Sequence, residues 1–201
     1  MCFDDIEIAP GHVIFLNGPS SAGKTSIATE LQKKLGEPFV IFGIDKMIGM
    51  MPTHVNNWEG EPAELGFWWH EEWDEDGSVL KYIQMGPFAK KIIRTLPGIT
   101  LSMLQNGLNV IIDEICVSPG CYLHWQKELS DYRVLYVGVK APVSVLEQRE
   151  KARGDRIIGS ARAQNKEVHK DKAYDLMVDT AEHSTDKCVE FIIDAYLKKR
   201  G

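Results

Sequence analysis

Residues 18–25 read Gly-Pro-Ser-Ser-Ala-Gly-Lys-Thr and satisfy every constrained position of the pattern G-x-x-x-x-G-K-[ST]. The apolar run 12–17 precedes the pattern, and apolar residues recur at helical spacing over 26–35 behind it. A strand, a glycine loop and a helix in this order surround a phosphate with backbone N–H groups and a positive helix end. The pattern therefore predicts an α/β fold with a phosphate-binding loop. The alternative is a glycine-rich turn that merely precedes a helix.

The loop residues have separate predicted roles. Lys24 can reach the β- and γ-phosphates of a nucleotide, and the Thr25 hydroxyl can bind Mg²⁺. ATP and Mg²⁺ are therefore the expected cofactors. The predicted nucleotide-binding residues are Gly18, Pro19, Ser20, Ser21, Ala22, Gly23, Lys24 and Thr25.

Short apolar runs alternate with amphipathic stretches along the rest of the chain, which is typical of an α/β domain with a parallel sheet. The predicted strands are 13–16, 39–44, 110–112, 134–139 and 176–178. The predicted helices are 26–35, 88–105, 119–129, 143–152, 161–168 and 185–199. Pro97-Gly98 is expected to kink or split the second of these helices. Because there is no repeat and no linker, residues 1–201 are expected to form one domain.

One segment, about 54–85, breaks this alternation. It holds four of the five tryptophans and a turn signal at 74–77, so it predicts an inserted hairpin or lid over the carboxyl edge of the sheet. The tryptophans either line an acceptor pocket or pack the insert onto the body. A pocket beside Asp45 walled by Trp68 and Trp69 would favour a largely neutral hydroxyl compound.

Two aspartates end predicted strands and are candidates for the chemistry. Asp45 ends the run 42–45, where a carboxylate can take a proton from an acceptor hydroxyl or hold it in line. The alternative is an N-cap of a helix over 46–51. Asp113 ends the run 109–113, a Walker-B-like pattern that would hold Mg²⁺ directly or through water. Many buried strands end in Asp, but the phosphate loop favours the metal role, with Glu114 as a lesser candidate.

Three arginines, Arg149, Arg153 and Arg156, are spaced by four and three residues, so they would project from one side of a helix. Gly154 would loosen that helix like a hinge, which predicts a lid over about 149–160 that closes on ATP and brings positive charge to the transferring phosphoryl group. The alternative is a solvated helix whose charges pair with neighbouring acids. The phosphate loop favours the lid. The candidate catalytic residues are thus Asp45, Lys24, Arg153, Arg156 and Arg149.

The bulk properties exclude several functional classes. The net charge of −6 argues against a broad nucleic-acid surface. No apolar run approaches the roughly 20 residues that span a bilayer. The acidic N-terminus lacks the basic start of a signal peptide, so the cytoplasm is the expected compartment. Four cysteines form no C-x-x-C pair and six histidines show no metal-binding spacing, so we expect reduced thiols and no zinc site.

Several segments together resemble the chloramphenicol phosphotransferases. The resemblance implies a P-loop kinase-like three-layer sandwich with a five-stranded parallel sheet in the order 2-3-1-4-5, and transfer of the ATP γ-phosphoryl group to an alcohol. It also matches Asp45 to the family's proposed base, and Arg153 and Arg156 to its lid arginines. The similar segments, in the family's order from about residue 12 to 195, are 16–25, 42–45, 111–113, 137–139, 149–150, 152–156 and 174–180.

We therefore expect an ATP-dependent phosphotransferase whose partners are ATP and a small hydroxyl-bearing acceptor, without a membrane or a nucleic acid. One alternative is a kinase of nucleosides, sugars or a nucleic-acid end. Another is a nucleotide-dependent switch that binds a protein partner through the tryptophan insert. The sequence leaves open the acceptor, the choice between ATP and GTP, and whether the chain forms a homo-oligomer.

Overall fold

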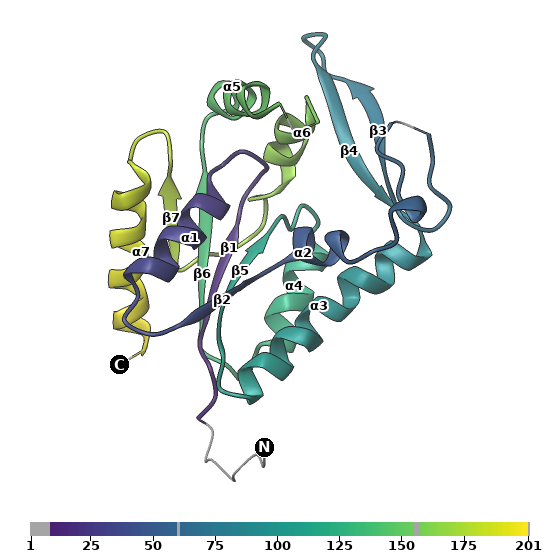
Figure 1. Cartoon of the computed structure of the whole chain (residues 1–201). Helices are drawn as coiled ribbons and strands as arrows, with labels where there is room; N and C mark the ends of the chain where they lie inside the picture. Colours follow the sequence, from purple (N-terminus) through teal and green to yellow (C-terminus); the bar gives the residue numbers. More distant parts are fainter. Residues whose placement is uncertain (1–8, 60, 155–156, 201) are drawn as a thin grey trace.

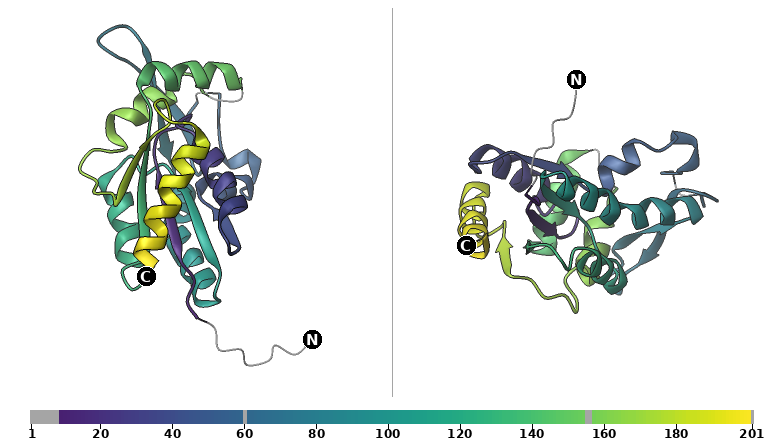
Figure 2. Two further views of the ribbon diagram at one scale, coloured as in Figure 1. Left: turned by 90° about the vertical axis from the view of Figure 1, so that its left-hand side faces the viewer. Right: turned by 90° about the horizontal axis from the view of Figure 1, so that it is seen from below.

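A five-stranded parallel sheet forms the centre of the computed structural model, which describes residues 9–59, 61–154 and 157–200. The strand order is β2-β5-β1-β6-β7, which is the order 2-3-1-4-5 when the five parallel strands are numbered along the chain. The predicted sheet order is thus confirmed, and helices cover both faces in a three-layer arrangement (Figures 1 and 2). The strands are β1 (Val13–Asn17), β2 (Phe39–Phe42), β5 (Asn109–Glu114), β6 (Val134–Lys140) and β7 (Leu176–Asp179).

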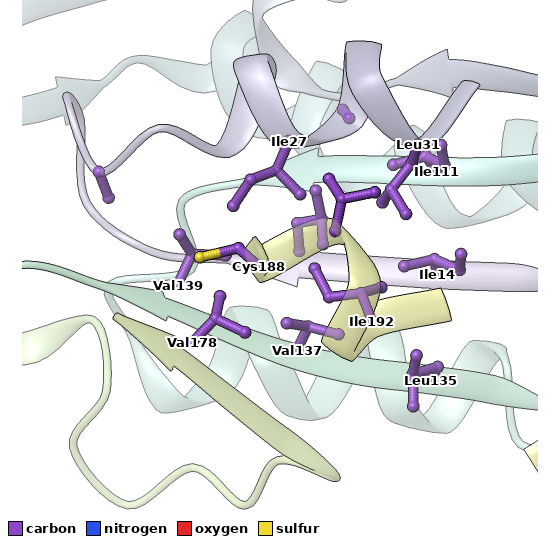
Figure 3. Close-up of a cluster of buried hydrophobic side chains, with 14 of the residues drawn as sticks. Ile14, Ile27, Leu31, Ile111, Leu135, Val137, Val139, Val178, Cys188 and Ile192 are labelled. Atoms are coloured by element: carbon purple, nitrogen blue, oxygen red, sulfur yellow. The ribbon is translucent and has the colours of Figure 1, made fainter. Parts of the chain in front are cut away.

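Helices α1 (Lys24–Lys34) and α7 (Thr185–Arg200) cover one face of the sheet. Side chains alternate along β1, so Ile14 and Leu16 point to this face. They pack with Ile27 and Leu31 of α1 in a cluster that is closed to solvent (Figure 3). This packing holds α1 against the strand that precedes it, which fixes the loop between them.

Helices α3 (Pro87–Gln105) and α4 (Pro119–Glu128) cover the opposite face, against Phe15. The α3 helix runs unbroken through Pro97, so the expected split is wrong. A proline inside a helix removes one hydrogen bond. Pro97 is buried, and Leu96 and Leu104 of the same helix pack in the apolar cluster against the sheet, so tertiary packing on both sides of the proline keeps the helix continuous.

The segment set apart in the sequence contains a short 3₁₀ turn, Thr53–Val55, and an antiparallel pair of strands, β3 (Phe67–Trp73) and β4 (Val79–Met85). We call residues 67–85 the hairpin. Its root packs on α2 (Ile44–Gly49) and α3, because Phe67 lies in one apolar cluster with side chains of both helices. The turn at 74–78 closes with Gly77 at φ +78°, as the sequence signal predicts.

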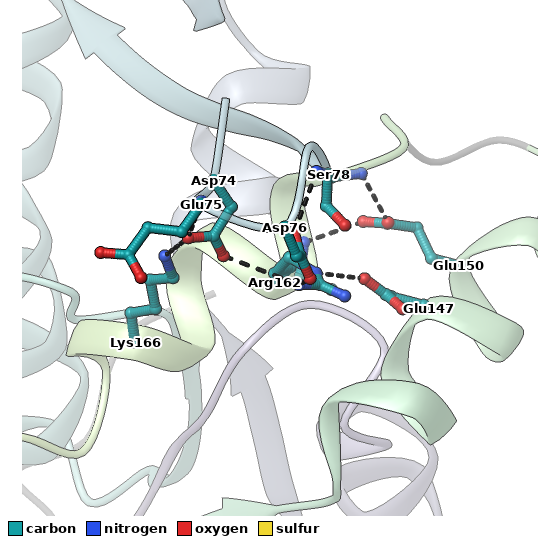
Figure 4. A network of polar contacts seen from close by, with 10 residues as sticks. Asp74, Glu75, Asp76, Ser78, Glu147, Glu150, Arg162 and Lys166 are labelled. Carbon is teal, nitrogen blue, oxygen red and sulfur yellow. Dashed lines mark hydrogen bonds and ion pairs between the residues drawn. The ribbon is translucent and has the colours of Figure 1, made fainter. Parts of the chain in front are cut away.

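The hairpin turn is tied by charge to the two remaining helices, α5 (Val143–Arg153) and α6 (Ser160–Glu167). Arg162 of α6 pairs with Asp76, at 2.8 Å, and also with Glu147 of α5 (Figure 4). Lys166 pairs with Asp74 at 2.9 Å. Hydrogen bonds from Ser78, then from Arg162, lower the pKa of Asp76 to about 2, so this contact persists well into acid.

A membrane-spanning helix is not found: no helix in the described parts of the chain is long and apolar enough to cross a bilayer.

Candidate active site

The loop between β1 and α1 has the geometry of an anion cradle. Ser21 and Gly23 adopt left-handed conformations, with φ of +62° and +93°, and α1 begins at Lys24 directly behind them. The first N–H groups of a helix lack partners within the helix, so they are available to a phosphate. The Ser21 hydroxyl is buried without a hydrogen-bond partner among the described residues, although it lines the cleft. These features fit a bound nucleotide phosphate.

A buried amide, Asn17, fixes the point where β1 enters this loop. Its Nδ2 donates to the Val168 carbonyl at 3.0 Å and to the Tyr174 hydroxyl at 2.7 Å. Its Oδ1 accepts from the Cys116 N–H at 2.8 Å. Since Asn17 is fully buried, these bonds join three separate segments behind the phosphate loop and hold its start in place.

Lys24, Thr25 and Asp113 meet at the bottom of the cleft. The Thr25 hydroxyl donates to Asp113 Oδ2 at 2.7 Å, and Lys24 Nζ lies 3.8 Å from Asp113 Oδ1. Lys24 Nζ also donates to the Pro19 carbonyl at 3.0 Å. A hydroxyl and a carboxylate are oxygen donors that suit Mg²⁺, which usually takes one or two protein ligands beside phosphates and water. No larger group of His, Cys, Asp or Glu side chains gathers for a metal in the described part of the chain.

Asp45 lies beside Asp113 at the cleft, in the first turn of a helix and not at the end of a strand. Strand β2 ends at Phe42 and α2 starts at Ile44 with Gly43 as its N-cap, so the capping alternative for Asp45 is wrong. A Cβ on Gly43 would lie 2.1 Å from the Asp113 carbonyl oxygen. This close approach of the two main chains, which only glycine permits, brings the start of α2 to the carboxyl end of β5.

The two arginines of the predicted lid that the structure describes, Arg149 and Arg153, have different surroundings. Arg153 ends α5 and lines the cleft. Arg149 donates to the Thr180 hydroxyl and carbonyl after β7, each at 2.8 Å, and also to the Ser21 carbonyl of the phosphate loop at 3.4 Å. Arg156 lies outside the described residues. Gly154 terminates α5 with φ +68°, so it ends the helix where the sequence predicted a hinge within it.

The cleft gathers most of the predicted site residues. Those that line it are Ser20, Ser21, Gly23, Lys24, Thr25, Asp45, Asp113 and Arg153, together with Ser26, Ile44 and Ile115, which the sequence did not single out. Gly18, Pro19 and Ala22 belong to the same loop but do not line the cleft. Arg149 is likewise absent from its walls.

The residues that follow Asp113 lie in a buried, electrostatically unusual setting. Burial raises the pKa of the Glu114 carboxyl well above its ordinary value, so Glu114 is a poor metal ligand compared with Asp113.

Cys116 and Cys121 lie with their sulfur atoms 3.0 Å apart. Burial raises the pKa of the Cys116 thiol, whereas the hydrogen bond from Cys116 lowers that of Cys121. Cys116, Cys121 and Cys188 are free thiols, as expected.

The tryptophans of the insert lie away from the cleft walls. Trp58 stacks on Phe67 with ring centroids 6.3 Å apart, and it also contacts Trp69 at 6.4 Å. Trp68 points to the opposite face of the hairpin, because neighbouring residues of a strand alternate. Of the two roles left open by the sequence, the contacts of Trp69 support packing of the insert, whereas a pocket role for Trp68 stays a prediction.

Comparison with known proteins agrees with this geometry. A family model described as "Chloramphenicol phosphotransferase-like protein" matches residues 11–197. A Mycobacterium tuberculosis protein named "Putative O-phosphotransferase" is 30% identical over 170 residues, which cover 85% of this chain and 75% of that protein.

Solved structures with the same fold include several kinases. The Mycobacterium tuberculosis APS kinase CysC, in complex with AMPPNP and APS, superposes with a TM-score of 0.63 at 19% identity, covering 94% of this chain and 98% of that one. A gluconokinase from Sinorhizobium meliloti gives a TM-score of 0.56 at 13% identity, covering 96% and 94%. At these identities the likeness concerns the fold.

Proposed function

The chain belongs to the chloramphenicol phosphotransferase-like family and has the fold of P-loop kinases, and from this we propose that it transfers the γ-phosphoryl group of ATP to a hydroxyl of a small molecule. The observation that carries the proposal is that one cleft is lined by Lys24, Thr25, Asp45, Asp113 and Arg153. Phosphoryl transfer needs positioning and charge stabilisation more than covalent chemistry, and these residue types supply both.

The phosphate loop and its lysine would bind the nucleotide. The N–H groups at the start of α1 and the Lys24 ammonium face the β- and γ-phosphates, and Lys24 neutralises charge that grows on the bridging oxygen as ADP leaves. Thr25 and Asp113 would hold Mg²⁺, which supplies Lewis-acid polarisation of the phosphate oxygens when bound. Arg153, which ends α5 and lines the cleft, would add positive charge to the transferring group.

Asp45 would orient and deprotonate the acceptor. In the transfer, the acceptor oxygen forms a bond to the γ-phosphorus while the bond from that phosphorus to the β–γ bridging oxygen breaks. The hydroxyl proton passes to the Asp45 carboxylate, and the products are a phosphate ester and ADP. The exposed position of Asp45 in the first turn of α2 leaves its carboxylate accessible to an incoming hydroxyl.

A product screen tests this proposal. The protein is incubated with ATP, Mg²⁺ and, one at a time, chloramphenicol, gluconate, glucose, a nucleoside and a 5′-hydroxyl oligonucleotide, and products are identified by mass spectrometry. We expect one small alcohol to gain a phosphoryl group. Slow ATP turnover that no acceptor changes would contradict the proposal and favour the nucleotide-dependent switch.

Two variants assign the roles once an acceptor is found. Lys24→Ala should lower kcat/KM by roughly 100-fold or more, because one preorganised charge on the transition state is lost. Asp45→Asn should retain the melting temperature and ADP affinity but lower kcat by roughly 100-fold, since an amide cannot take the proton. Asp131→Asn, at an exposed position before β6, is the matched control. Full transfer activity in folded Asp45→Asn would show that Asp45 is not the base.

A further inference from the structure

A second cavity lies next to the cleft and is far larger, with a volume of about 560 Å³. Strand β4 of the hairpin contributes Tyr82 and Gln84 as one wall. Ser118, the N-cap of α4, contributes the second wall, and Gln164 and Glu167 of α6 the third. Figure 1 shows these elements around the carboxyl edge of the sheet, with α6 between α5 and the hairpin. A volume of this size is typical of a site for a small organic molecule.

The cavity and the cleft have different lining residues, but two connections place them close together. The segment after β5 runs from one to the other, because Ile115 lines the cleft whereas Val117 and Ser118 line the cavity. The second connection is a hydrogen bond of 2.7 Å from the Ser20 N–H in the phosphate loop to Gln164 Oε1. A molecule in the cavity would therefore lie beside the phosphate loop.

Gln164 is the residue that makes this cavity chemically specific. Its side chain is only 9% exposed. Because a backbone N–H can only donate, the oxygen of the amide must face Ser20, and the NH₂ group is the other end. Among the described residues this NH₂ group has no acceptor, although Gln164 lines the cavity. The NH₂ group is not enclosed by protein, since it is not one of the buried unpaired atoms, so it is open to an oxygen of a ligand in the cavity.

The charges around the cavity favour neutral or cationic ligands. Two carboxylates line the cavity, Glu72 from the hairpin and Glu167 from α6. The one lysine of the lining, Lys81, is paired with Glu71 of the neighbouring strand. An anionic ligand would therefore meet two carboxylates and a cation that is already engaged.

We propose that this cavity holds the phosphoryl acceptor, and that the Gln164 amide donates a hydrogen bond to an acceptor oxygen while its carbonyl holds the phosphate loop. The inference rests on the proposed function. It defines the acceptor as a neutral or cationic hydroxyl compound that carries a further oxygen, as a hydroxyl, carbonyl or ether. Gln164 thereby positions the acceptor relative to the loop that binds ATP.

Binding measurements test the inference without turnover. Calorimetry in saturating ADP compares chloramphenicol, glucosamine and gluconate as neutral, cationic and anionic probes. We expect the neutral or the cationic probe to bind and gluconate not to bind. Gln164→Glu keeps the oxygen that accepts from Ser20 but lacks the donors, so it should raise the Kd of the bound probe about tenfold or more.

Two further variants complete the design. Asn165→Asp adds the same charge to α6 at a position that does not line the cavity, and it should leave the probe Kd unchanged. Gln84→Leu alters the hairpin wall at a residue that does not line the cleft, so it should weaken the probe but not ADP, even if Gln164→Glu disturbs the loop.

The outcomes separate this inference from the proposed function. Tightest binding by gluconate, no binding by all three probes, or a probe Kd that stays within twofold in both Gln164→Glu and Gln84→Leu would overturn the inference. Binding that follows the expected pattern in a protein that phosphorylates no acceptor would instead contradict the proposed function.

Discussion

At the scale of single residues, the neighbouring acids Asp113 and Glu114 have different surroundings, because one lies at the cleft and the other is buried. Asp113 faces the cleft and accepts from Thr25. Glu114 points into the protein, where it is only 4% exposed and its Oε1 has no hydrogen-bond partner among the described residues. Because side chains alternate along β5, Asp113 faces the cleft and Glu114 points into the protein interior.

The buried Glu114 predicts a dependence of stability on pH. Its pKa in the folded protein is raised above the ordinary 4.5 by burial, so the unfolded chain releases this proton first. The free energy of unfolding should fall as the pH rises from 4.5 through the raised pKa. Glu114→Gln removes this titration, and its melting temperature should exceed that of the wild type more at pH 8 than at pH 5. A difference that stays constant between these pH values would argue against the assignment.

Arg153 lines the cleft whereas Arg149 does not, so Arg153 is the arginine whose substitution tests the charge on the transferring group. Arg153→Ala should lower kcat by roughly 100-fold and change ADP affinity much less, because its charge matters most in the transition state. Lys151→Ala, exposed on the same helix, is the control and should change neither quantity. Equal losses of kcat and ADP affinity in Arg153→Ala would show that the contact already exists in the bound ground state.

At the scale of elements, the junction of α5 and α6 depends on one buried acid, Glu150. The Gly159 N–H and the Ser160 hydroxyl each donate to it at 2.8 Å, and the Ala161 N–H donates at 2.9 Å. The carboxylate thus satisfies the first turn of α6 from the last turn of α5. Gly159 makes the junction feasible, because its φ is +92° and a Cβ there would lie 2.5 Å from the Val79 carbonyl oxygen of the hairpin.

Loss of this acid should loosen both helices. Glu150→Ala leaves several buried donors without an acceptor, so we expect a loss of roughly 2–3 kcal/mol in the free energy of unfolding. Denaturant titration with Lys151→Ala as the control measures it, and the control should stay within about 0.5 kcal/mol of the wild type. Stability of Glu150→Ala equal to that of the control would mean that Glu150 does not hold the junction.

At the scale of the whole molecule, periodicity predicts the layers well and the side-chain partners poorly. The five parallel strands and six of the helices follow from apolar spacing, because each must bury one face on the sheet. The sequence reasoning considers a helix over 46–51 only as the alternative role of Asp45, and it misses that α2 begins at Ile44, a position that depends on the contact of Gly43 with the end of β5. It also misses Gln164 and Glu150, because a polar residue in a charged helix gives no sign that it is buried. Their spacing shows a helix, but only the packed neighbours show which face is covered.

The hairpin joins the rest of the protein through the apolar root at Phe67, the charged turn at Arg162 and a hydrogen bond from the Lys81 N–H to the Gly159 carbonyl, and its β4 strand forms a cavity wall. A segment with this arrangement can be exchanged as a module. A hairpin from a relative that keeps Asp74, Asp76 and the root should attach to the same body and present a different surface to the cavity. With the acceptor in this cavity, as we propose, recombination during evolution or in the laboratory would change acceptor preference while the phosphate loop stays untouched.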